Sequence, residues 1–251
     1  MLRTAVRKQK TARRPDEVTR AAEGSSSGAG LTGRIRQVDR MLVARYGEPP
    51  MYTGLEDPLD TLIRTVLSQN TSDVNSHRAF KELKARFPSW EQAATARVDA
   101  IERSIHSGGM SHQKAPRIKA ILAAVRESMG AYTLENLRGL DTEQTMVYLT
   151  GLPGVGPKTA AVVCVFNLGR PVFPVDTHVF RVSKRLGLVP AGANAEKTFV
   201  LLDAAVPDKL KFRLHINLIL HGRAVCIARR PRCSLCPLLT ICPRVGVTDS
   251  Q

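Results

Sequence analysis

The chain has 251 residues, enough for one large domain or two smaller domains that each have a hydrophobic core. Its 37 Lys and Arg residues outnumber 22 Asp and Glu residues, and the formal charge of +15 favours a polyanionic partner such as nucleic acid or an acidic membrane surface. No apolar run approaches the ~20 residues of a membrane span, and no apolar stretch follows the basic N-terminus as in a secretory signal. We therefore expect a cytoplasmic protein, associated with the nucleoid if the source is bacterial.

Residues 1–30 contain seven Lys and Arg, three Asp and Glu, and the run GSSSGAG, without apolar periodicity. This composition predicts a disordered basic tail, which is either only solvated or adds contacts with phosphates. Subtracting the tail's net charge of +4 from +15 leaves +11 on the rest, so the folded part is itself basic.

Helical spacing of apolar residues dominates the remainder of the chain. One helix is expected from Leu31 to a stop at Gly47, and another begins after the cap Asp57 with Pro58 in first position. Further helices are expected around 80–87, from the cap Ser89 to the glycines at 108–109, and around 118–129, 142–149 and 157–166. Since no convincing run of alternating strand residues occurs, the sequence predicts an all-α fold.

The stretch LPGVGPKTAAVVCVF, residues 152–166, predicts a tight glycine turn followed by a helix that begins at Pro157. Gly154 and Gly156 let the backbone turn sharply, and amides beside a helix N-terminus can bind a phosphate. A sharp corner between two helices without a ligand is the alternative. The Lys-Thr-Ala-Ala that follows and the basic charge favour phosphate binding, and the turn is too short for a nucleotide P-loop.

Lys158 falls in the first turn of this helix, where the helix dipole disfavours a cation and favours the neutral amine. A neutral amine at a DNA surface can act as a nucleophile, and a contact with phosphate is an equal alternative. In VFPVDTHVFRV, Asp176 precedes another helix. It either caps that helix or places a carboxylate beside a reacting carbon, and one aspartate can do both.

Four of the five cysteines lie within seventeen residues, separated by six, two and five positions: Cys226, Cys233, Cys236 and Cys242. In a reducing compartment clustered cysteines more often bind metal than form disulfides. Four thiolates suit either zinc or an iron–sulfur cluster. Arg229, Arg230 and Arg232 lie between the first two cysteines and form either a loop that binds phosphates or merely a charged surface. Cys164 stands apart and is expected in the core.

The motifs LPGVGPKTAAVV, PVDTHVFRV and Cys-x6-Cys-x2-Cys-x5-Cys, in this order, resemble the endonuclease III family of DNA glycosylases from about residue 31 to Cys242. The resemblance implies two lobes with a cleft between them. One is a six-helix domain with a helix-hairpin-helix over residues 52–170, and the other is a cluster domain of residues 31–51 and 171–243 followed by a tail at 244–251. It also implies a structural [4Fe–4S] cluster on the four cysteines, a monomer, and double-stranded DNA with damaged bases or abasic sites as the partner, without a membrane.

The same resemblance implies that Lys158 attacks C1′ of the nucleotide while Asp176 supports the charge that develops on the sugar. The resulting Schiff base would permit β-elimination, and the expected substrates are oxidised pyrimidines. The family's gap-filling glutamine falls on Asn70, with Gln69 one position earlier, and residues 108–118 resemble the next DNA-facing loop. His178 and Asp73 are equally compatible with a structural role. The expected DNA contacts are Gln69, Asn70, Leu152, Gly154, Val155, Gly156, Thr159, Arg229, Arg230 and Arg232.

Two alternatives remain open. One is a monofunctional or mismatch-specific glycosylase with weak lyase activity. Mismatch-specific adenine glycosylases lack the lysine and carry an extra C-terminal domain, for which the nine residues after Cys242 leave no room. The other is a non-catalytic protein that binds abasic or distorted DNA.

Overall fold

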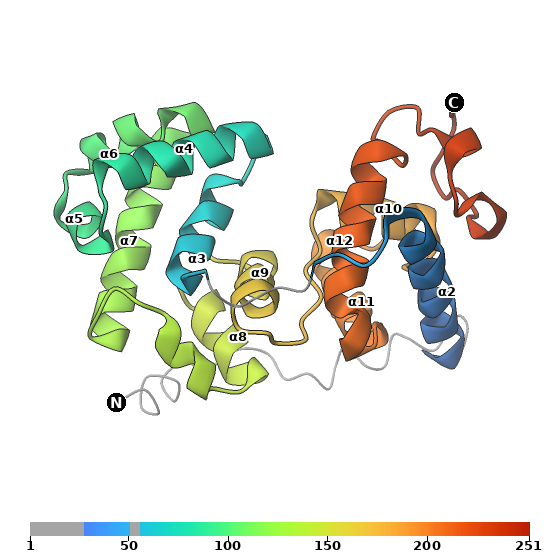
Figure 1. Cartoon of the computed structure of the whole chain (residues 1–251), viewed down its shortest axis with the longest axis horizontal. Helices are drawn as coiled ribbons and strands as arrows, with labels where there is room; N and C mark the ends of the chain where they lie inside the picture. The colour runs from blue at the N-terminus through green and yellow to red at the C-terminus, as the bar shows by residue number, and fades with distance from the viewer. Residues whose placement is uncertain (1–27, 51–55) are drawn as a thin grey trace. The chain divides into compact units, whose positions relative to one another are not determined.

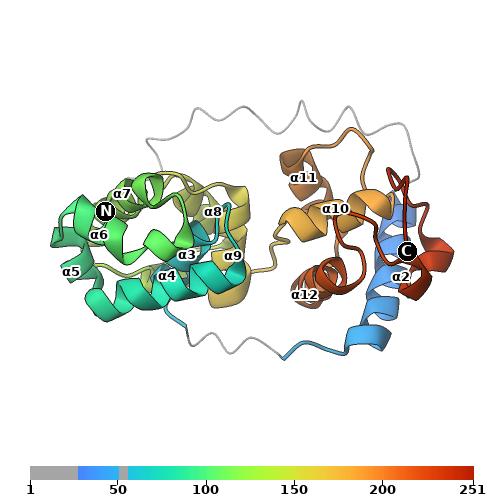
Figure 2. The ribbon, with the colours of Figure 1, turned by 90° about the horizontal axis from the view of Figure 1, so that it is seen from above.

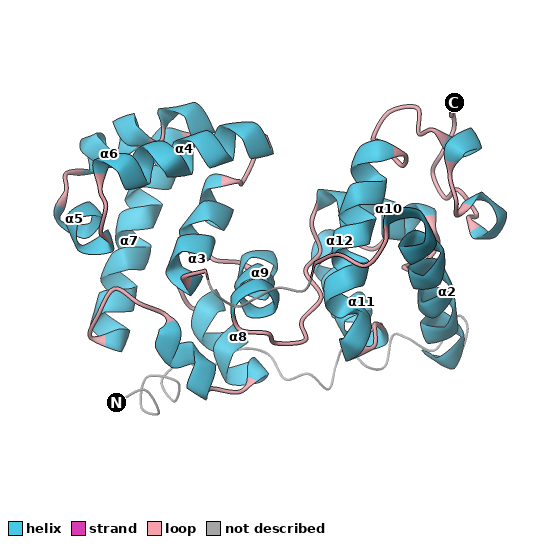
Figure 3. Ribbon diagram, in the orientation of Figure 1, coloured by secondary structure: helices cyan, strands magenta, loops and turns pink. Residues whose placement is uncertain are grey.

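The computed structural model describes residues 28–50 and 56–251, which form helices joined by loops and contain no strand (Figure 3). The predicted all-α fold class is confirmed. Over the same residues no helix has both the length and the apolar character to cross a membrane. The described residues divide into two compact units. Residues 56–170 are here called the hairpin unit, and residues 28–50 with 171–251 are called the cysteine unit.

The hairpin unit is built around a buried central helix, α3, that packs against α4, α7 and α9 (Figure 1). Eight of the ten residues of α3 are buried, and its start confirms the sequence prediction because the Asp57 side chain accepts a hydrogen bond from the Leu59 amide and Pro58 takes the first position. The elements are α3 (Pro58–Leu67), α4 (Asp73–Arg86), α5 (Trp90–Thr95), α6 (Val98–Ser104), η3 (His106–Gly108), α7 (Ser111–Met129), η4 (Glu135–Gly139), α8 (Thr142–Thr150) and α9 (Pro157–Asn167).

The segment predicted as one helix after Ser89 forms two short helices, so the described part of this unit contains seven α-helices rather than six. Ser89 caps α5 as predicted, through a reciprocal capping box with Gln92. The chain then becomes extended at Ala96 before α6 begins. Lys119 stabilises the break, because its Nζ donates to the carbonyls of Ala94 and Ala96 at 2.5 and 2.6 Å.

The cysteine unit joins a helix from the start of the chain to the C-terminal helices, and α2 packs against α12 and α11 while α10 packs against α12 (Figure 2). Nε and Nη2 of Arg213 donate to the carboxylate of the buried Asp39 of α2, at 3.0 and 2.6 Å. Phe173 and Leu42 are fully buried in the shared apolar core. The elements are α2 (Gly28–Tyr46), α10 (Thr177–Arg185), α11 (Ala195–Ala205), α12 (Asp208–Ala224), η5 (Cys233–Leu235) and η6 (Leu239–Ile241).

The two predicted tails differ in what the structure describes of them. Residues 1–27 of the predicted basic tail lie outside the described residues, and residues 28–30 already belong to α2. At the other end, the backbone of residues 244–251 is hydrogen-bonded to the rest of the cysteine unit. The Val245 amide donates to the Arg185 carbonyl at 3.1 Å, and Gln251 pairs with Pro231 and Ser234 at 2.9 and 3.0 Å. This segment is therefore part of the unit rather than a tail.

Candidate functional site

The glycine turn predicted between α8 and α9 is present. The Val155 amide donates to the Leu152 carbonyl at 3.1 Å, and Gly154 has a φ of +72° that favours glycine. The side chains of Leu152 and Val155 are buried and anchor the turn in the core, whereas Gly154 and Gly156 are exposed. The exposed surface of the turn therefore includes the backbone of two glycines beside the Pro153 side chain, and contacts with a phosphate here would come from amide groups.

The first turn of α9 places the next two predicted residues. Lys158 is the second residue of the helix, after the cap Gly156 and Pro157, and is half-buried. Thr159 is only 3% exposed, so its side chain packs in the core, and its expected contact with DNA stays a prediction. Cys164, in the same helix, is fully buried, which confirms its expected place in the core.

The loop after α3 separates the two candidate gap-filling residues. Gln69 is half-buried, and its Oε1 accepts a hydrogen bond from Nη1 of Arg117 at 2.8 Å. Asn70 is exposed and has a left-handed backbone with φ +54°. Its Nδ2 lies 3.7 Å from Sδ of Met110, which is also left-handed, with φ +52°, and exposed. Non-glycine residues in this conformation carry strain and concentrate at functional sites.

Lys114 is a structural residue of this site that the sequence analysis did not single out. It is 2% exposed, and its Nζ donates to the carbonyls of Leu67 and Gly108 at 2.7 and 2.9 Å. Burial lowers its pKa, with Arg117 adding a smaller repulsion. One charge thus ties the end of α3 to η3. Lys114 lies four residues before Ile118, on the apolar stripe of α7, and this position in the sequence indicates that its side chain is buried.

Asp176 belongs to the cysteine unit and caps α10, because its Oδ1 accepts from the Val179 amide at 2.7 Å. The cap confirms the local role predicted for it, and Oδ2 is not needed for this bond. The extended segment before it is held at Phe173, whose amide donates to Asp203 at 2.7 Å, and at Pro174, whose carbonyl lies 2.9 Å from Nδ1 of the buried His215. Lys158 lies in the other unit, and its pairing with Asp176 stays a prediction.

His178 and Asp73, for which the sequence left a structural or a functional role open, both have a local structural environment. Nδ1 of His178 lies 3.1 Å from Nη2 of Arg181 in the next turn of α10. Asp73 is the first residue of α4, after the cap Ser72, where the helix dipole favours a carboxylate.

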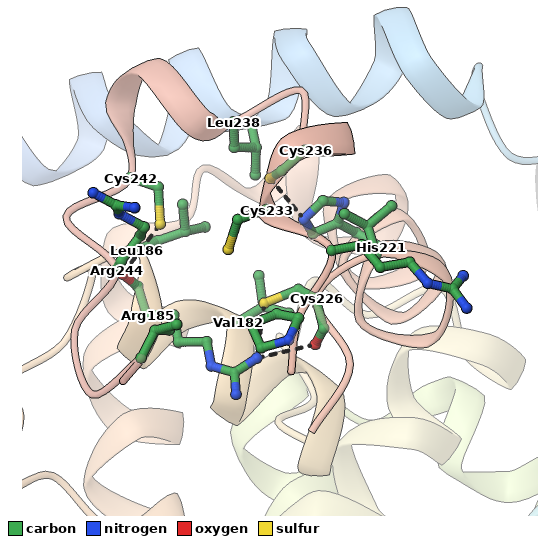
Figure 4. Close-up of a pocket in the computed structure, with 14 residues that line it drawn as sticks. Val182, Arg185, Leu186, His221, Cys226, Cys233, Cys236, Leu238, Cys242 and Arg244 are labelled. Carbon is green, nitrogen blue, oxygen red and sulfur yellow. Dashed lines mark hydrogen bonds between the residues drawn. The ribbon is translucent and has the colours of Figure 1, made fainter. Parts of the chain in front are cut away.

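The four clustered cysteines carry free thiols that surround a common space (Figure 4). This space is partly open to solvent, and no carboxylate lines it. Its remaining wall is largely apolar and includes Val182, Leu186 and Leu238. Over the described ranges, no group of three or more His, Cys, Asp or Glu side chains is placed to hold a metal ion. Four thiol donors without a carboxylate are the ligand chemistry of a sulfur-bound metal centre.

Burial disfavours the charged form of two of these thiols. Burial raises the pKa of Cys236 to about 11 and raises that of Cys242. A metal centre bound here would displace the thiol protons. Nη1 of Arg185 lies 3.4 Å from Sγ of Cys226. Burial also lowers the pKa of the neighbouring His221 to about 4, which leaves this ring neutral, with Nε2 3.5 Å from Sγ of Cys236.

The three arginines after Cys226 are all exposed, as expected of a basic loop. Arg230 has a left-handed backbone, and its Nε lies 3.0 Å from the carboxylate of Asp249, an ion pair in which both side chains are more than 60% exposed. The base of the loop is fixed from α10, because the Arg185 guanidinium donates to the carbonyls of Ile227 and Ala228 at 2.7 and 2.8 Å. The loop thus presents positive charge on a fixed base.

Residues 63–207 match the HhH-GPD superfamily of base excision DNA repair proteins. Endonuclease III of Thermotoga maritima is 33% identical over 208 residues, which cover 83% of this chain and 92% of that protein. Endonuclease III of Escherichia coli K12 is 32% identical over 77% of this chain and 87% of its own length. An Arabidopsis thaliana protein named as a candidate DNA glycosylase is 46% identical over 171 residues, and the match spans 58% of that longer protein.

Solved structures agree with these relatives. A non-covalent complex of endonuclease III with DNA superposes with a TM-score of 0.73 at 29% identity, covering 85% of this chain and 95% of the other. A trapped covalent intermediate of endonuclease III with DNA gives a TM-score of 0.74 at 29% identity, covering 85% and 96%.

Proposed function

This chain belongs to the HhH-GPD superfamily of base excision DNA repair proteins, and from that premise we propose the reaction it performs and the residues that perform it. It is an endonuclease III-like DNA glycosylase, an enzyme of base excision repair. We propose that it removes oxidised pyrimidines from duplex DNA and then nicks the strand as an abasic-site lyase. It acts as a monomer in the cytoplasm.

The position of Lys158 carries this proposal. Lys158 is the second residue of α9, directly after a turn that exposes the backbone of two glycines. If the turn binds a backbone phosphate, the amine is brought to the sugar of the neighbouring extruded nucleotide. The solved covalent complex of a related enzyme with DNA supports covalent chemistry of this kind.

In the proposed reaction, the Nζ lone pair of Lys158 attacks C1′ and the C1′–N bond to the damaged base breaks, so that the base leaves with the bonding electrons and takes up a proton. Asp176 stabilises the positive charge that develops on the sugar. Ring opening gives a Schiff base, loss of a C2′ proton then expels the 3′ phosphate, and water finally releases the lysine. No net oxidation occurs.

Four cysteines, Cys226, Cys233, Cys236 and Cys242, would hold a [4Fe–4S] cluster. Such a cluster supplies a cross-link between α12 and the C-terminal segment, and the reaction has no step that depends on it. The loop that begins at Cys226 carries the exposed arginines, and we assign to it non-specific contacts with DNA phosphates.

Asn70 is the residue that we assign to the gap left by the extruded nucleotide. It is exposed at the tip of the loop after α3, whereas the amide oxygen of Gln69 is already bound by Arg117. Residue 70 also occupies the position of the family's gap-filling glutamine, although an asparagine side chain is one methylene shorter.

Borohydride trapping on DNA with one abasic site tests this function. Wild type should give a covalent protein–DNA adduct and release an oxidised pyrimidine from a duplex, and Lys158→Ala should do neither while still binding DNA. Lys184→Ala is the control, because it removes a lysine from the last turn of α10 and leaves α9 unchanged.

Base release without trapping would indicate a monofunctional glycosylase. Binding without release of any base by the wild-type protein would indicate a non-catalytic DNA binder.

A further inference from the structure

The contacts of α7 point to a role for one side chain beyond the reaction described above, on whose assignment this inference rests. Arg117 extends from α7 to two segments far away in the sequence. Its Nη1 donates to Oε1 of Gln69, 48 residues earlier, at 2.8 Å. Its stem lies against the glycine turn, because a Cβ built on Gly154 would come within 2.4 Å of Nε and 2.5 Å of Cδ.

The absence of a side chain at residue 154 therefore serves two purposes. The φ of +72° favours glycine, and the space that a Cβ would fill is occupied by Arg117. Gly156, two residues later in the same turn, has nothing within 4 Å of its Cβ position. The close approach is thus specific to one residue of the turn and one arginine.

The other end of the contact is a strained loop. Gln69 precedes Asn70, which is exposed with φ +54°, and Lys114 holds the base of the same loop at the Leu67 carbonyl. Lys114 and Arg117 are three residues apart on one face of α7. That face therefore fixes the loop at two points, and through Arg117 it also connects the loop with the glycine turn.

We propose that Arg117 is a positioning residue that couples the glycine turn to the loop of residues 68–72. When the turn binds the DNA backbone, Arg117 and Gln69 hold the loop in the conformation that presents Asn70 to the duplex. Extrusion of the damaged nucleotide needs this conformation, whereas the lyase step on an existing abasic nucleotide, which has no base to unstack, depends on it much less.

The test compares two single-turnover rates: release of one oxidised pyrimidine from a duplex, and nicking at a preformed abasic site. Arg117→Met and Gln69→Leu should each slow base release about tenfold, as expected for loss of a charge-assisted hydrogen bond, and slow nicking less than twofold. The double variant should be no slower than the slower single variant. Gln69→Glu keeps the acceptor and should lose less base release than Gln69→Leu. Arg126→Met, an exposed arginine at the far end of α7, is the matched control.

Equal losses in both rates would reduce Arg117 to a purely structural residue, and multiplicative losses in the double variant would exclude the coupling. If the wild-type protein releases no base, the proposed function fails. The coupling is then tested by hydrogen exchange, which does not depend on catalysis. Binding of an undamaged duplex should slow amide hydrogen exchange in residues 68–72 of wild type and of Arg126→Met, but not of Arg117→Met. Protection that persists in Arg117→Met would overturn the inference.

Discussion

At the scale of single residues, Lys114 shows how a charge can replace a helix cap. It is almost fully buried, and it satisfies two carbonyl groups at the ends of α3 and η3 that would otherwise lack donors. Its ammonium loses its hydration, which lowers its pKa, and regains two short hydrogen bonds. The loop that follows Leu67 therefore starts from a fixed point.

Lys114→Met should lower the free energy of unfolding by about 2–4 kcal/mol, because two buried carbonyls lose their donor while the apolar volume is kept. Chemical denaturation measures this value. Lys81→Met, an exposed lysine of α4, is the control and should change it by less than about 0.5 kcal/mol. Similar values for the two variants would contradict a capping role for Lys114.

Asn70 illustrates strain at a functional position. Asn70→Gly removes the cost of its left-handed backbone and should leave stability unchanged or raise it by up to about 1 kcal/mol. It also removes the side chain assigned to the gap, so the rate of base release should fall about tenfold. Thermal melting and single-turnover kinetics measure the two effects, and an undiminished rate would remove Asn70 from its assigned role.

At the scale of an element, the start of α10 combines a cap with a proposed catalytic group. Asp176 accepts the Val179 amide with Oδ1. Since asparagine is an equally good cap, the structural and catalytic roles of this residue can be separated by substitution.

Asp176→Asn should keep the melting temperature of wild type and lose most of the base-release activity, because the cap survives and the charge does not. Asp176→Ala should lose the activity and also about 1 kcal/mol of stability. Calorimetry and the base-release assay distinguish these outcomes. An Asn variant with normal activity would leave Asp176 as a cap alone.

The four cysteines lie at the end of α12 and around η5 and η6, so a centre bound by them would link these elements. The purified protein should be yellow-brown and contain iron. Cys236→Ser should lose iron and roughly 10 °C in Tm, because binding free energy at such a site is also folding free energy. Cys164→Ala, which changes a core cysteine outside the cavity, should keep its iron. A colourless wild-type protein with bound zinc would refute the cluster.

At the scale of the whole molecule, the formal charge of +15 sets the interaction with DNA. Most of this charge lies outside the N-terminal tail, and the basic loop after Cys226 contributes three exposed arginines. Arg230 is paired with Asp249, but exposed ion pairs contribute little free energy, so a DNA phosphate can compete with that carboxylate.

Changing Arg229, Arg230 and Arg232 together to Gln should reduce the slope of log K against log salt by about 2–3, since each phosphate contact contributes about 0.9. Binding isotherms at several salt concentrations give the slope. The control changes Arg86, Arg97 and Arg126, three exposed arginines of the hairpin unit, to Gln and alters the net charge equally. Equal slopes in both triple variants would show that the loop contributes only its charge and makes no phosphate contacts of its own.

The sequence by itself determined the helical fold, the glycine turn and the caps at Asp57, Ser89 and Asp176. Each of these depends on hydrogen bonds or φ values within three residues, so local spacing is sufficient to predict them. The family resemblance rests on short motifs of the same kind.

Only the tertiary structure decided which residue of the loop after α3 is exposed, why Lys114 is buried and where the helix after Ser89 breaks. Gln69 is held from 48 residues away, and Lys114 reaches the Leu67 carbonyl over 47. Lys119 caps the broken helix from more than 20 residues away. Such contacts form only after the helices pack, because packing sets which side chains meet, and no spacing along the chain encodes that distance.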